Sequence, residues 1–149
     1  YPYNAEALIL DGAVTTTLPA AQTAPVWEFD AKANISFATA TDENKSLSFQ
    51  NTCGLIRFKN NLTDLTAIKL TAQGVNIAGN VKIDASGNLT VESGSNVITL
   101  SAKEGTFVGP NDANANAKEY SMVVHLLVDL PWNCQRLLVM KLIHSVAKT

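Results

Sequence analysis

The sequence predicts a mainly β fold in which two antiparallel sheets pack as a sandwich. Residues 1–110 hold all eight glycines and all five phenylalanines. They form short segments in which polar and apolar residues alternate, and Gly, Asn or Asp interrupts these segments every few residues. Turn sequences recur at roughly 8 to 12 residue spacing, which is typical of an antiparallel sandwich with one face of each sheet buried.

The individual strands are predicted from this alternation, in chain order. The expected strands are Ala33–Thr39, Leu47–Gln50, Cys53–Lys59, Thr66–Thr71, Val75–Ala78, Asn80–Asp84, Asn88–Glu92 and Asn96–Ala102. Turn residues at Ala85–Asn88 and at Glu92–Ser95 predict two hairpins. The expected core side chains are Phe37, Phe49, Ile56, Phe58, Ile68, Leu70, Ile83, Val91 and Leu100.

Composition excludes several classes of protein. The 149 residues carry 11 Lys plus Arg against 13 Asp plus Glu, a net charge of -2. Without a basic cluster the chain lacks the electrostatic footprint of a nucleic-acid-binding protein. No apolar run reaches the roughly 18 residues that cross a bilayer. With 46% hydrophobic residues the chain can build the core of one domain.

The last 29 residues differ from the rest. Residues 121–149 contain no Gly and no Phe, yet they hold both methionines and both histidines. We expect Met122–Val128 to form a strand that completes a sheet. Leu138, Leu142 and Val146 follow helical spacing, so we expect a helix over Gln135–Val146 that packs on exposed apolar surface. A one-base frameshift in the coding sequence would explain such an abrupt change, and a genuine segment that caps the sandwich is the alternative.

No catalytic, cofactor-binding or metal site is predicted. The sequence has no nucleophile elbow, zinc-protease motif, phosphate loop or dinucleotide fingerprint. Ser86 and Ser95 lie in expected turns, and the carboxylates Asp84 and Glu92 flank one hairpin. His125 and His144 could each pair with Asp129 or with an acidic residue from the preceding part of the chain, although a lone His in an apolar segment is more often packed than catalytic. A non-enzymatic role is therefore favoured.

Two further groups of residues bear on binding and on redox chemistry. Aromatic side chains could form a sugar-stacking face, and the candidates are Trp27, Trp132, Tyr1, Tyr3 and Tyr120. The favoured alternative is that Trp27 packs as a strand residue at the rim of the sandwich. Cys53 and Cys134 are 81 residues apart. Two free thiols are favoured over a disulfide, and Cys53 is expected to be a buried, unreactive thiol.

Four stretches of the chain resemble the fimbrillin family, the subunits of type V pili of Bacteroidales. The stretches are Tyr1–Tyr3 with Thr15–Gln22, Leu47–Phe58, Leu65–Ala72 with Asn76–Gly79, and Asn96–Leu100. The resemblance covers roughly residues 1–110 and departs from the family pattern at His125. A family strand of the aromatic-Val-Val-Ala-Pro kind begins correctly at Met122 and then diverges.

The resemblance implies a fold, a location and a role. It implies a transthyretin-like β-sandwich over residues 1–120, followed by the atypical segment 121–149. It also implies a lipoprotein precursor that is exported to the outer-membrane surface and built into a fimbrium. The partners would be other pilus subunits or a second copy, together with host or glycan ligands, and no cofactor. This chain would correspond to the N-terminal domain of such a subunit. A surface glycan-binding β-sandwich is the alternative function.

Overall fold

The computed structural model describes residues 4, 5, 7–41, 43, 45–60, 62, 64–109, 118–125 and 138–144, the last range by its backbone alone. These residues form a mainly β structure, as the sequence predicts, and contain no helix. The strands are β1 (Leu8–Leu10), β2 (Ala13–Leu18), β3 (Ala21–Ala24), β4 (Ser36–Phe37), β5 (Gln50–Asn51), β6 (Gly54–Lys59), β7 (Leu65–Ala72), β8 (Ala78–Ile83), β9 (Leu89–Ser95), β10 (Val97–Ala102), β11 (Glu119–Val124) and β12 (Leu138–His144).

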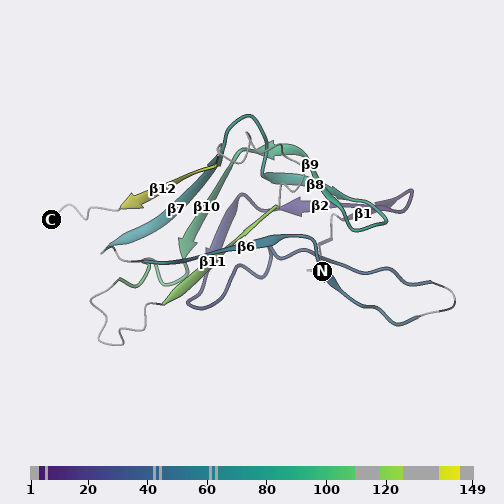
Figure 1. Ribbon diagram of the computed structural model, residues 1–149, viewed down its shortest axis with the longest axis horizontal. Helices are drawn as coiled ribbons and strands as arrows, with labels where there is room; N and C mark the ends of the chain where they lie inside the picture. Colours follow the sequence, from purple (N-terminus) through teal and green to yellow (C-terminus); the bar gives the residue numbers. More distant parts are fainter. Residues whose placement is uncertain are drawn as a thin grey trace.

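The strands form two four-stranded sheets and two short ribbons (Figure 1). One sheet has the order β1-β2-β8-β9, and the other has the order β12-β7-β10-β3. All pairs are antiparallel except β10 with β3. Two bent segments connect the sheets, because β2 leads through Pro19 into β3 and β9 leads through Asn96 into β10.

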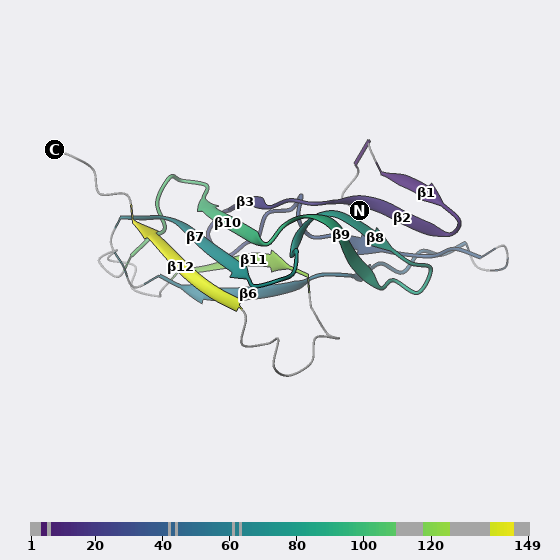
Figure 2. The same ribbon diagram turned by 90° about the horizontal axis from the view of Figure 1, so that it is seen from above.

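The larger core lies between the β12-β7-β10-β3 sheet and the β6–β11 ribbon (Figure 2). Ile68 and Leu70 of β7 and Leu100 of β10 are at most 3% exposed. Tyr120 and Met122 of β11 face them, with exposed fractions of 0% and 1%. Ile56 and Phe58 of β6 pack against the same cluster with partial exposure, and the exposed residues of β6 alternate with them as predicted.

A second core lies under the β1-β2-β8-β9 sheet. Leu18, Val81 and Ile83 supply its sheet face. Ala33, Ile35, Cys53 and Val123 cover them from the other side, and Phe37 and Val91 pack at the margin. β11 therefore serves both cores, since Met122 faces one and Val123 faces the other. All its residues except Glu119 are buried for this reason.

Several sequence predictions are wrong. Residues 138–144 form strand β12 and not part of a helix over Gln135–Val146; the rest of that range lies outside the described residues. Apolar residues dominate the segment, with Lys141 between them, so its pattern could not separate helix from strand. In the structure, β12 forms a ladder with β7 that runs from Leu138 opposite Ala72 to His144 opposite Leu65. This ladder uses backbone groups that β7 would otherwise leave unpaired.

Further errors concern two strands, one side chain and one turn. The strand expected at Ala33–Thr39 is limited to Ser36–Phe37, and the strand expected at Leu47–Gln50 begins only at Gln50. Phe49 is 58% exposed and does not belong to the core, because β5 begins only at Gln50. Glu92–Ser95 is not a hairpin turn, since β9 continues through it to Ser95. Gly94 lies opposite Gly79 in the β8–β9 ladder. A Cβ atom at either glycine would collide with the backbone of the other strand, so glycine here permits close approach of two strands.

Candidate functional site

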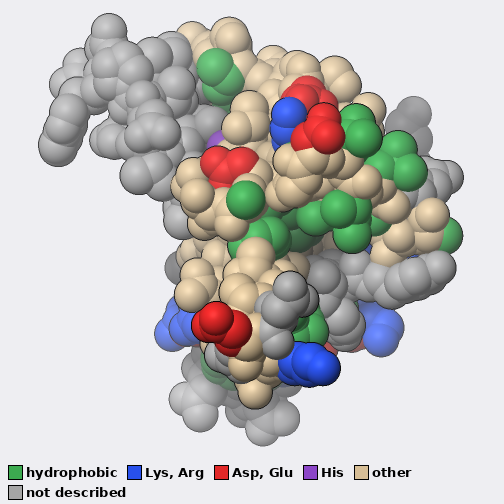
Figure 3. Space-filling model, turned by 90° about the vertical axis from the view of Figure 1, so that its right-hand side faces the viewer, with side chains coloured by type: hydrophobic (Ala, Val, Ile, Leu, Met, Phe, Trp, Pro, Cys, Tyr) green, Lys and Arg blue, Asp and Glu red, His purple; other side chains and the backbone are tan. Residues whose placement is uncertain are grey.

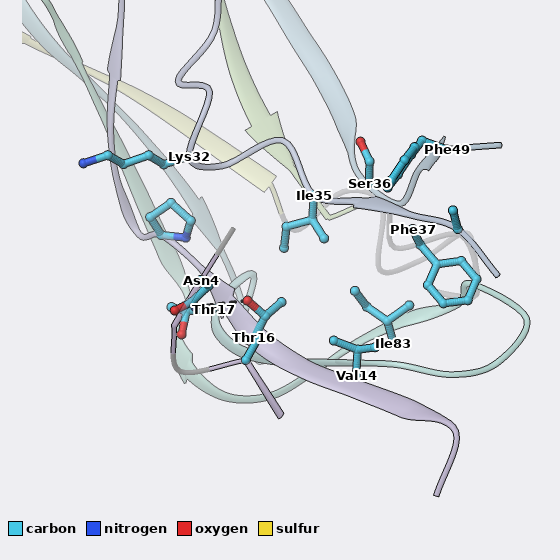
Figure 4. A pocket seen from close by; sticks show the side chains of 13 residues that line it. Asn4, Val14, Thr16, Thr17, Lys32, Ile35, Ser36, Phe37, Phe49 and Ile83 are labelled. Atoms are coloured by element: carbon cyan, nitrogen blue, oxygen red, sulfur yellow. Dashed lines mark hydrogen bonds between the residues drawn. The ribbon is translucent and has the colours of Figure 1, made fainter. Parts of the chain in front are cut away.

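A groove of about 490 Å³ lies at one end of the second core. Val14 and Thr16 of β2 and Ile83 of β8 form one wall, and Ile35, Phe37 and Phe49 approach from the other side (Figure 4). The groove opens here because β4 and β5 are only two residues long, so no continuous sheet covers β2 and β8. Its size lies within the range of small-ligand sites.

The lining of this groove is apolar with a few hydroxyl groups. Asn4 donates from Nδ2 to Oγ1 of Thr16 across 3.2 Å. Thr17 and Ser36 add two further hydroxyls. Lys32 is the one charged residue among the described lining residues, and its amine points away from the space between the walls (Figure 4). Such a surface can bind apolar groups, and it brings together no acid with a base or nucleophile.

Cys53 is buried beside the groove and carries a free thiol. Burial raises the pKa of this thiol, and hydrogen bonding to Thr52 and Ile35 opposes that shift only in part. Because the thiolate is the reactive form, a raised pKa makes the thiol a poor nucleophile. The predicted burial is confirmed. Cys134 lies outside the described residues.

His125 immediately follows β11. Its Nδ1 atom is buried and has no hydrogen-bond partner within the described part of the chain. Desolvation lowers the pKa of the imidazole. Asp129, one proposed partner, lies outside the described residues, and His144 is described by its backbone alone. No described carboxylate therefore orients this imidazole for catalysis.

The hairpin carboxylate Asp84 has a structural role. Its Oδ1 accepts hydrogen bonds from the backbone N–H of Ser86 at 2.8 Å and of Asn88 at 2.9 Å. Its Oδ2 accepts from Nδ2 of Asn88, and this side-chain bond is the main reason that the pKa of Asp84 is lowered. Ser86 thus serves the β8–β9 turn, and Ser95 likewise bonds locally to Val97. Glu92 is exposed on β9.

The predicted aromatic platform is not assembled by the described residues. Tyr120 is fully buried, packs edge-on against Phe107 at 4.6 Å, and accepts a hydrogen bond at its hydroxyl from Val108 N–H. Trp27 is 58% exposed and lies in the turn Pro25–Glu28, not in a strand. Its φ of +66° is unusual for a bulky residue. Tyr1, Tyr3 and Trp132 lie outside the described residues.

Neither a metal centre nor a membrane span emerges from the described ranges. Within them no three His, Cys, Asp or Glu side chains are grouped as metal ligands. The same ranges contain no helix of a length and hydrophobicity suited to crossing a bilayer. The residue pattern does not predict the groove, because one wall comes partly from strand β2, where the pattern predicts no strand. Val14 and Ile83 are distant in sequence and adjacent in the β2–β8 ladder.

Comparison of the chain with protein-family models, curated proteins and solved structures gave no match. The fimbrillin resemblance therefore remains a prediction from the sequence.

Proposed function

We propose that the chain is a non-enzymatic, cell-surface structural domain of a fimbrillin-like pilus subunit or adhesin, which acts through subunit assembly. The observation that carries this proposal is the ladder between β12 and β7. An isolated seven-residue strand from the far end of the chain pairs with the edge of a sheet. The same backbone ladder can hold a strand from a neighbouring subunit, because strand addition depends on main-chain hydrogen bonds.

The neighbourhood of this edge suits strand addition. The β7 side chains alternate, with Leu65, Ile68 and Leu70 buried in the larger core. On its other side β7 pairs with β10, so the edge that β12 occupies belongs to a rigid, packed strand. An added strand therefore meets a fixed register instead of a flexible loop, which lowers the entropic cost of binding.

The test compares the full chain with a chain that lacks residues 133–149, together with a synthetic peptide of residues 137–145. We expect the shortened chain to bind the peptide and to self-associate in size-exclusion chromatography. We expect the full chain to form no fibres alone in electron micrographs. A shortened chain that neither binds the peptide nor associates would contradict the proposal. So would turnover in a broad hydrolase panel that one Ser, His or Asp substitution abolishes.

Exposed Trp27 favours a second candidate function, that of a surface glycan-binding module. Trp27 is 58% exposed, and an exposed indole ring can stack on a sugar ring. Affinity-gel retardation in soluble polysaccharides tests this candidate with the Trp27→Ala variant. Phe49→Ala is the matched control, since Phe49 is also 58% exposed. Retardation that only Trp27→Ala abolishes would favour the glycan-binding module over the pilus domain.

A further inference from the structure

The β1 strand carries an unusual surface for the edge of a sheet. Leu8, Ile9 and Leu10 are 66%, 80% and 72% exposed, and no charged residue interrupts them. Within the described residues β1 pairs only with β2, so its second edge meets no strand. Exposed apolar edge strands promote pairing with another chain, and soluble proteins usually protect them.

The other sheet edges in the described part of the chain are protected. β9 carries Glu92, β12 carries Lys141 at its centre, and β6 carries Arg57 and Lys59. A carboxylate oxygen of Asp30 accepts a hydrogen bond from Thr23 N–H at the edge of β3.

The free edge of β11 is also covered. The N–H of Trp27 donates to the carbonyl of Glu119, and the N–H of Ser121 donates to the carbonyl of Glu28. The ribbon strands β4 and β5 are two residues long, one fewer than β1, and each carries polar side chains: Ser36 in β4, and Gln50 and Asn51 in β5. Only β1 combines an open ladder with uninterrupted apolar side chains among these edges.

The direction of the backbone groups in β1 follows from its turn. Asp11 and Gly12 both have positive φ, at 51° and 74°, and form a two-residue hairpin loop between β1 and β2. The flanking pair Leu10 and Ala13 then exchange both backbone hydrogen bonds, and Leu8 and Thr15 do the same. Ile9 lies between these pairs, so its N–H and C=O point away from β2.

We infer that β1 is the contact surface for a second copy of this chain, with β1 of each copy antiparallel to the other and Ile9 opposite Ile9. This inference specifies a partner and a surface for the assembly role proposed above, and so rests on it. In this register Leu8 lies opposite Leu10 of the second copy, and Asp11 lies opposite Ala7. No like charges face each other, whereas self-pairing about the centre of β9 or β12 would oppose two Glu92 or two Lys141 residues.

The groove supports the same arrangement. Ile9 is the ladder partner of Val14, whose side chain lines the groove, so both side chains lie on one face of the sheet. The two-fold axis of an antiparallel strand pair is perpendicular to the sheet, and both grooves therefore open on the same face. Figure 3 shows hydrophobic side chains gathered at this end of the molecule. The dimer joins two apolar walls into one continuous surface.

Sedimentation equilibrium of the full chain over a wide concentration range tests the inference. We expect a reversible dimer of twice 15.9 kDa. Ile9→Lys should raise the dimer dissociation constant about tenfold or more, because it opposes two charges at the centre of the ladder. Ile9→Pro should have a similar effect, because it removes only an N–H that points away from β2. Leu55→Lys, at an exposed apolar position on β6, is the control and should leave the dimer unchanged.

Two results would overturn the inference: a monomer at every concentration, or a dimer that persists in Ile9→Lys or Ile9→Pro. Hydrogen exchange of the unmodified chain gives an answer even where a variant fails to fold. The Ile9 amide should become more protected as the concentration rises, and protection that is independent of concentration would contradict the proposed ladder. Failure here leaves peptide binding at β7 unaffected, so the two proposals are separately testable.

Discussion

A single side-chain amide, that of Gln22, joins strand β3 to strand β11 of the β6–β11 ribbon across the protein interior. Its Nε2 donates to the carbonyl of Val123 at 2.8 Å, and its Oε1 accepts from the N–H of the same residue at 2.9 Å. The amide thus bonds to β11 as a neighbouring strand would, although Gln22 belongs to β3. Gln22 is only 2% exposed, so water cannot replace these bonds.

We therefore expect Gln22→Leu to destabilise the protein by about 2–5 kcal/mol, because two buried backbone groups lose their partners. Urea denaturation measures the loss. Gln73→Leu, at an exposed position, should change stability by less than about 0.5 kcal/mol. Equal effects of the two substitutions would show that the Gln22 bonds contribute nothing specific.

His125 should make stability depend on pH. Desolvation lowers the pKa of the folded imidazole below its ordinary value of 6.5, so the unfolded chain binds the proton more readily. Stability is then fully present above pH 6.5 and falls as the pH drops toward the folded pKa. Thermal midpoints measured across this range should show the fall, and His125→Gln should remove it.

Asp84→Asn is the control for the pH series. The lowered pKa of Asp84 confines its contribution to much more acidic conditions, where stability is lost as the pH falls through its folded value. This variant should therefore keep the dependence near pH 6. If Asp84→Asn removed that dependence and His125→Gln did not, His125 would not be its source.

At the scale of elements, the crossing of β8 and β9 depends on two glycines. A Cβ on Gly79 would collide with the Ser93 carbonyl and with Gly94, and the φ of Gly79 is +125°. Gly79→Ala should cost about 3 kcal/mol or more, since strand separation or a strained backbone must follow. Gly74→Ala also has positive φ but open space, so its cost should stay near 1 kcal/mol. Thermal unfolding of the two variants measures the difference, and equal losses would refute the close-approach argument.

The strand predictions are most accurate for strands in which one face is more buried than the other. The predictions for β6, β7, β8 and β10 agree with the structure within one or two residues, because one face of each strand is less exposed than the other. Of the strand expected at Val75–Ala78, only Ala78 belongs to a strand. The sequence pattern predicts no strand at the positions of β1, β2 and β3. Their alternation is weak, and their pairing with β8 and β10 depends on contacts distant in sequence.

At the scale of the whole molecule, the prediction of a mainly β architecture is confirmed, while the site had no sequence signal. Composition and turn spacing were sufficient for the sandwich, since both reflect how each sheet buries one face. The groove exists because the β4–β5 ribbon does not extend over the whole β2–β8 face. The residue pattern within one strand carries no information about this relation between strands. β12 is a similar case, because its apolar residues form a strand through backbone pairing with the edge of β7.

The whole-molecule account rests on sheet edges as functional surfaces. β7 holds the C-terminal strand, and β1 exposes an uncharged ladder at the other end of the molecule (Figure 1). Neither surface requires a catalytic residue. Because these two strand edges lie at opposite ends of the molecule, one domain could contact two neighbouring subunits, as the subunit of a fibre must.

Residue-resolved hydrogen exchange along β7 is the most direct test of the central claim, that the β7 edge holds an added strand. In the full chain, amides throughout Leu65–Ala72 should be protected, because β10 covers one edge and β12 the other. Deletion of residues 133–149 should expose the alternate amides that face β12 and leave those that face β10 protected, and the peptide of residues 137–145 should restore the lost protection. Protection along β7 that is identical with and without the C-terminal segment would contradict the account.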